Sequence, residues 1–72
     1  MELHINRKDG DNANLAIDYG ANYALALQAL TKIVDNDIKM YKEIGLNDLK
    51  LTTENNHFYL KGKGVRNEYY IN

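Results

Sequence analysis

With 72 residues, the chain is long enough for one compact domain and too short for two separate hydrophobic cores. The absence of cysteine excludes disulfides and thiolate-bound zinc, and the formal net charge of -1 gives no overall attraction for a polyanion such as duplex DNA. The uncharged stretch over residues 20–31 is shorter than the roughly 20 apolar residues that span a bilayer. We therefore expect one domain over residues 1–72, located in the cytoplasm and not in a membrane.

The first part of the chain shows the alternation of apolar and polar side chains that is typical of β-strands. Leu3 and Ile5 alternate with polar neighbours, and the same period of two returns over residues 15–19. Residues 9–12, Asp-Gly-Asp-Asn, are turn formers and separate the two runs. This pattern predicts an opening hairpin with one apolar and one polar face.

From Ala21 the apolar period changes to that of an amphipathic helix. Gly45 stands just past the end of this run, and Leu46 can fold back on Tyr41 as the apolar partner of a Schellman cap. We expect one long helix whose apolar side chains face the core. The residues of its predicted stripe are Tyr23, Leu27, Leu30, Val34, Ile38, Tyr41 and Ile44.

Asp35, Asn36 and Asp37 interrupt this helix with three poor helix formers in succession. They could instead cap a second, shorter helix that begins at Ile38. The apolar stripe keeps its phase across the triplet, whereas a loop would normally reset it. We therefore favour one helix, continuous or kinked, with the triplet on its surface.

After Gly45 the period of two returns, and it predicts three more strands. Turns are expected over residues 54–56 and at Gly62-Lys63-Gly64, where both glycines tolerate a positive φ. The expected order is ββαβββ. One helix with one apolar stripe covers one face of an antiparallel sheet of four to five strands, so the fold class is a two-layer α+β domain.

The polar face of this sheet is the candidate site. It combines aromatic rings with basic groups, a combination found both in protein interfaces and in modules that bind unpaired bases. The alternative is that Tyr59 and Tyr70 form cross-strand pairs that only stabilise the sheet. The candidate binding residues are Lys50, His57, Tyr59, Lys61, Arg66 and Tyr70.

No residue pattern indicates an enzyme, a metal site or a cofactor. The chain has no serine or cysteine nucleophile, and its threonines have no evident base beside them. His4 and His57 are the only histidines, and no third metal ligand accompanies them. Lys61–Gly64 lacks the longer loop and the following helix of a phosphate-binding P-loop. We expect no small-molecule substrate.

These observations lead to a non-enzymatic protein–protein interaction module. The chain has ten Asn, seven Lys, six Ile and six Tyr, and the codons for these four residue types are rich in adenine and thymine, which suggests an AT-rich genome. We therefore expect a small bacterial or bacteriophage protein. Its expected role is to inhibit or regulate a host protein, in the manner of anti-defence or anti-CRISPR proteins. Two alternatives remain, a single-stranded nucleic-acid-binding sheet and a structural homodimer.

Overall fold

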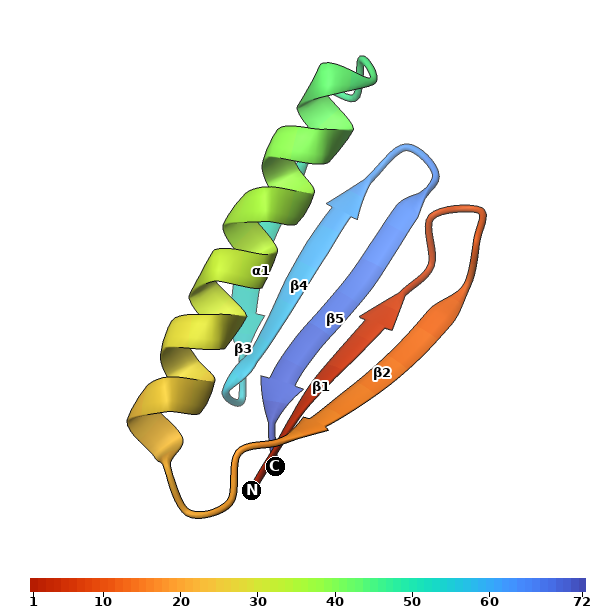
Figure 1. Ribbon diagram of the computed structural model, residues 1–72. Helices are drawn as coiled ribbons and strands as arrows, with labels where there is room; N and C mark the ends of the chain where they lie inside the picture. The colour runs from red at the N-terminus through yellow and green to blue at the C-terminus, as the bar shows by residue number, and fades with distance from the viewer.

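The computed structural model describes residues 1–72 and consists of a five-stranded antiparallel sheet with one helix packed on one face (Figure 1). The strand order is β2-β1-β5-β4-β3, so the first and last strands of the chain pair at the centre of the sheet. The predicted two-layer α+β fold with the order ββαβββ is confirmed. The elements are β1 (Glu2–Arg7), β2 (Ala13–Asp18), α1 (Tyr23–Glu43), β3 (Lys50–Glu54), β4 (His57–Gly62) and β5 (Val65–Ile71).

Two tight turns set the register of the last three strands. Asn55 and Asn56 join β3 to β4 with φ of 51° and 64°, a conformation that Asn tolerates better than most residues. Of the two glycines around Lys63, only Gly64 has a positive φ, at 79°. The expectation for Gly62 was wrong: a Cβ there would stand 2.8 Å from the Leu49 side chain, so this glycine permits a close approach of the chain.

The helix begins and ends at specific capping interactions. The Asn22 side chain accepts a hydrogen bond from the Leu25 amide at 3.0 Å. At the other end Gly45 has a φ of 96°, and the amide of Leu46 donates to the carbonyl of Tyr41 at 2.9 Å, which is the predicted Schellman cap. Between them α1 runs unbroken through the triplet 35–37, so the prediction of one helix is confirmed.

The core lies between α1 and the central strands, and it is small, with 11 of 72 residues buried. Tyr23, Leu27 and Ile44 of the predicted stripe are 53%, 39% and 70% exposed, contrary to expectation. Tyr23 is the first residue of the helix and Ile44 its C-cap, so both lie at the margin of the layer. The buried apolar residues are Leu3, Ile5, Ala26, Leu30, Val34, Tyr41, Leu60, Val65 and Tyr69.

Asp37 is buried among these apolar residues, although the acidic triplet was expected on the helix surface. It is only 6% exposed and receives two hydrogen bonds from the Arg7 guanidinium, at 2.9 and 3.0 Å. The Tyr69 hydroxyl donates a third, at 2.6 Å. Since a buried carboxylate is tolerated when it is paired and hydrogen-bonded, these three donors make its position possible.

The same network continues to the loop after β1. The buried Asn67 amide donates to the hydroxyls of Tyr41 and Tyr69, at 2.8 and 2.9 Å, and its oxygen accepts from the Lys8 amide. The Tyr41 hydroxyl then donates to Asp9 at 2.7 Å. Burial and the Asp9 carboxylate raise the pKa of Tyr41 to about 12, so its hydroxyl stays protonated as a donor.

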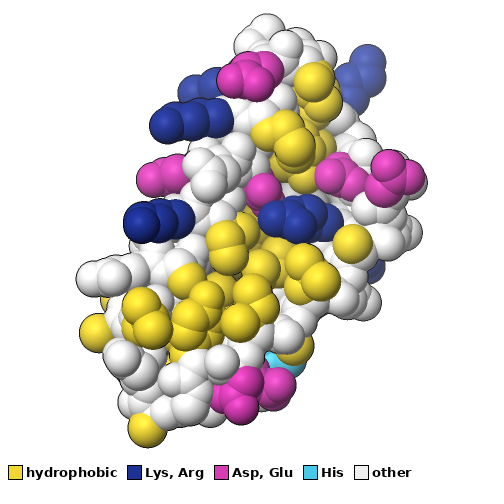
Figure 2. All heavy atoms as spheres, in the orientation of Figure 1, with side chains coloured by type: hydrophobic (Ala, Val, Ile, Leu, Met, Phe, Trp, Pro, Cys, Tyr) yellow, Lys and Arg dark blue, Asp and Glu magenta, His cyan; other side chains and the backbone are white.

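The helix covers only part of the sheet. A helix is about 10 Å wide, whereas five strands spaced about 4.8 Å apart extend nearly twice as far. Leu15 and Ile17 of β2 pair with the buried Ile5 and Leu3 on the helix side, yet they remain 48% and 39% exposed. Figure 2 shows hydrophobic side chains gathered beside the helix on this side of the molecule.

Candidate functional site

The open face of the sheet, opposite α1, carries all six predicted binding residues. Each of them alternates along its strand with residues that are buried or packed on the helix side, as Tyr59 and Lys61 do around Leu60. Their predicted placement on one face is therefore confirmed, and their role in binding remains a prediction. The antiparallel register arranges them in an aromatic row, a mixed row and a basic row across the strands.

The aromatic row consists of His4, Tyr70 and His57, which are neighbours in register on β1, β5 and β4. The Tyr70 ring stacks on His4 at 4.7 Å and on His57 at 4.3 Å, with interplanar angles of 6° and 10°. Both faces of Tyr70 are thus covered by its neighbours. The two histidines lie on either side of β5 with the Tyr70 ring between them, so they do not meet as a pair of metal ligands.

The mixed row places Glu68 of β5 opposite Tyr59 of β4 and Asn6 of β1. Glu68 also reaches into the aromatic row, where its carboxylate lies 2.6 Å from Nδ1 of His57. This hydrogen bond holds the pKa of Glu68 below its usual value, so the carboxylate is ionised at neutral pH. Desolvation and the nearby Glu68 raise the pKa of the Tyr59 phenol, which stays neutral.

The basic row places Lys50, Lys61 and Arg66 directly opposite one another on β3, β4 and β5. Like charges opposite each other destabilise a sheet. None of the four ion pairs in the structure includes these three residues. Lys61 has an aromatic neighbour instead, since its Nζ lies 5.6 Å from the centre of the Tyr59 ring.

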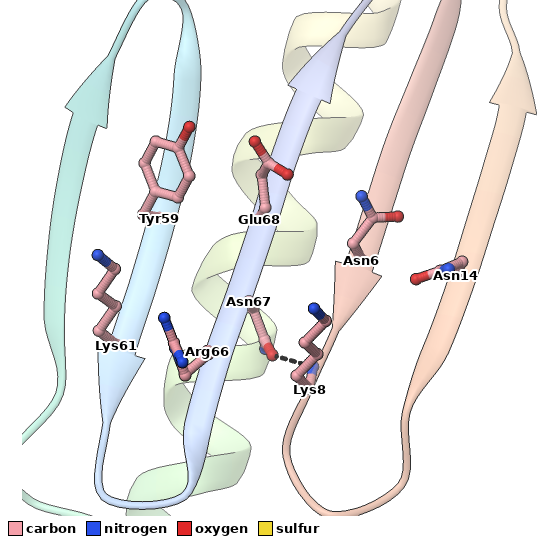
Figure 3. Close-up of a pocket in the computed structure, with 8 residues that line it drawn as sticks. All are labelled: Asn6, Lys8, Asn14, Tyr59, Lys61, Arg66, Asn67 and Glu68. Atoms are coloured by element: carbon pink, nitrogen blue, oxygen red, sulfur yellow. Dashed lines mark hydrogen bonds between the residues drawn. The ribbon is translucent and has the colours of Figure 1, made fainter.

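An open hollow of about 380 Å³ lies between the mixed row and the basic row. Figure 3 shows Lys61, Arg66 and Lys8 along one side of it, with Tyr59, Glu68 and Asn6 along the other. The hollow therefore combines three cations with phenol, amide and carboxylate groups. Its lining residues are Asn6, Lys8, Asn14, Tyr59, Lys61, Arg66, Asn67 and Glu68.

Sequence reasoning missed the residues that β1 and β2 contribute to this hollow. Lys8 lies two residues after Asn6 on the same face, so extending the alternation past the end of the strand would have found it. Asn14 faces Asn6 in register, which required knowing that β1 and β2 pair with this offset. Asn67 gives no periodic signal, since it is a polar residue on the apolar side of β5.

Outside the open face, the structure has no cluster of metal ligands, and it has an apolar groove beside the helix. No three His, Asp or Glu side chains converge on a place that could hold a metal ion. An apolar groove of about 190 Å³, lined in part by Tyr23, Leu27 and Phe58, runs between the helix and the β3–β4 hairpin. The helix has no segment that combines the length and apolar character needed to cross a membrane.

Comparison of the chain with protein-family models, with curated proteins and with solved structures finds no match.

Proposed function

We propose that this protein is a non-enzymatic interaction module whose open sheet face binds an acidic surface of a protein partner. The observation that carries this proposal is the row of Lys50, Lys61 and Arg66, which lie opposite one another in register while none of them takes part in an ion pair. Such a row destabilises the free protein, and carboxylates of a partner would remove the repulsion. Lys61, Arg66 and Lys8 line the hollow and are the proposed contact residues.

The remaining residues of the face fit the same role. Tyr59 and two of the three asparagines of the hollow, Asn6 and Asn14, can donate hydrogen bonds to carboxylates and to peptide carbonyls. The amide of the third, Asn67, already donates to Tyr41 and Tyr69. Tyr70 stacks on His57, and His57 is hydrogen-bonded to Glu68, so we assign His57 and Tyr70 to the framework that holds the face rather than to the contact itself.

Single-stranded nucleic acid is the second candidate ligand, because it would also be attracted by the basic row. Recognition of unpaired bases on a sheet uses aromatic rings with a free face. Tyr70 has no free face, since His4 and His57 cover both sides of it. This stacking is the reason for preferring a protein partner.

The proposal that the module inhibits or regulates a host protein rests on the composition and the size of the chain. The abundance of Asn, Lys, Ile and Tyr supports an origin in an AT-rich bacterium or bacteriophage. In such a setting the module would act in the cytoplasm as an inhibitor or regulator of a host protein.

The proposal is tested by titrating ¹⁵N-labelled protein with a short poly-glutamate peptide and, separately, with an oligothymidylate of equal charge. The peptide should shift the amide signals around Lys8, Lys61 and Arg66, and Arg66→Glu should weaken its binding by about tenfold. Lys39→Glu makes the same charge change on an exposed position of the helix and should have little effect.

Three results would speak against an acidic protein partner. These are shifts confined to other parts of the molecule, equal weakening by Lys39→Glu, and tighter binding of the oligonucleotide with loss on Tyr59→Ala. The last would favour the nucleic-acid alternative. Wild-type and Arg66→Glu protein can then serve as paired baits for the natural partner, which should be retained by the wild type alone.

A further inference from the structure

The edge strand β3 is exposed along its whole length. It is the last strand in the sheet order, so half of its backbone amides and carbonyls have no partner strand. All five of its residues are exposed, and the apolar Leu51 on its helix side is 45% exposed. An unprotected edge of this kind readily pairs with a strand from another chain.

The charges of β3 are complementary to those of a second copy of the same strand. Lys50 and Glu54 stand at its two ends on the open face, with Thr52 midway between them. When two such strands pair antiparallel about a two-fold axis at Thr52, Lys50 of each copy lies opposite Glu54 of the other. Opposite charges in this position stabilise a strand pair.

We propose that the protein forms a two-fold symmetric dimer through β3, which joins the two sheets into one continuous sheet. Pairing centred on Thr52 is the register that aligns all five residues of both strands. A shift of the centre to Leu51 would set Glu54 opposite Asp48 of the second copy, so repulsion disfavours it.

The dimer also resolves the repulsion that Lys50 meets in the single chain. Lys50 lies opposite Lys61 on β4 and takes part in no ion pair. Glu54 of the second copy would supply the missing carboxylate on its other side. On the helix side, Leu51 would lie opposite Thr53 of the second copy and lose part of its exposure to water.

The other free edge, β2, offers no comparable match. Its only charged residue is Asp18 at its end, so no pairing of β2 with itself forms an ion pair. Pairing through β3 leaves Lys8, Lys61 and Arg66 at the hollow accessible. Both proposals involve Lys50, but the dimer is tested by the oligomeric state and the proposed function by binding at the hollow, so either can fail without the other.

The oligomeric state is measured by sedimentation equilibrium of the full chain over a wide range of concentrations. An interface made by one short strand from each copy buries little surface, so we expect a weak dimer. Lys50→Glu should raise the dissociation constant about tenfold, because two attractive contacts in each dimer become repulsive. Glu54→Lys should do the same, and the double variant Lys50→Glu/Glu54→Lys should restore dimerisation.

Salt provides a second readout that loss of folding would not imitate. Added salt should weaken the wild-type dimer and strengthen the dimer of Lys50→Glu. The reason is that residue 50 attracts Glu54 of the second copy in the wild type and repels it in the variant. Leu15→Lys, on the exposed helix side of β2, is the control and should leave the dissociation constant unchanged. A monomer at every concentration, no recovery in the double variant, or dissociation caused by Leu15→Lys would overturn the proposal.

Discussion

Asp37 has a different environment from Asp35, although both belong to the same acidic triplet of the helix. Asp35 is exposed, whereas Asp37 lies in the core and is bound by Arg7 and Tyr69. Asp35 and Asp37 are two positions apart in the helix, so their side chains point about 200° apart around its axis. The two carboxylates therefore cannot share one environment. The hydrogen bonds of Asp37 tie the helix to β1 and β5.

The contribution of Asp37 can be tested against its neighbour. Asp37→Asn removes the negative charge that pairs with the Arg7 guanidinium. It should lower the free energy of unfolding by roughly 3 kcal/mol or more. Asp35→Asn should change it by less than about 0.5 kcal/mol, because that side chain is exposed. Urea denaturation of both variants measures the difference, and equal effects would contradict the buried role.

Helix α1 is stabilised by capping interactions at both ends, although parts of its sequence have low helix propensity. Its interior includes Asp35 and Asn36, which have low helix propensity, and its exposed N-terminal turn carries no acidic residue. The Asn22 side chain caps the first turn, and the Schellman motif at Gly45 satisfies carbonyls of the last. These caps, together with packing of the middle turns on the sheet, keep the helix continuous.

Two asparagine substitutions in this helix should have opposite effects. Asn22→Ala removes the cap and should destabilise the protein by about 1 kcal/mol. Asn36→Ala, at an exposed position in the interior, replaces a poor helix former with the best one and should stabilise by roughly 0.5 kcal/mol. Thermal unfolding followed by circular dichroism gives both values. A stabilising Asn22→Ala would show that the cap is not needed.

On the helix side of the molecule the central strands are covered, whereas the edge strand β2 remains open to solvent. Ile5 of β1 is 2% exposed, while Leu15, its partner in register on β2, is 48% exposed. The two side chains have similar size and lie on the same side of the sheet. Only the position of the helix across the sheet distinguishes them.

This difference should appear directly in stability. Ile5→Ala leaves a cavity under the helix and should cost about 2–5 kcal/mol, whereas Leu15→Ala should cost about 1 kcal/mol or less. Both values come from chemical denaturation of the monomer at low concentration. A large loss on Leu15→Ala would mean that β2 is covered in solution, for instance by another chain.

The rows of side chains on the open face depend on how all the strands pair in the sheet. Lys61 and Arg66 are joined by a hairpin and could be paired from the sequence, because turn residues fix their register. Lys8 and Asn14 come from the other hairpin and reach the same hollow only because β1 pairs with β5. No local pattern carries that information, since the pairing joins the two ends of the chain.

The sequence by itself determined the elements, their order, the end of the helix at Gly45 and the face on which Tyr59 and Arg66 lie. These features depend on periodicity, capping and turn chemistry, all of which act between residues close together in the chain. The tertiary structure alone decided the burial of Asp37 and Asn67, the exposure of Leu15 and the assembly of the hollow. Each of these depends on contacts between segments distant in sequence, where packing and pairing override the local preference of a side chain.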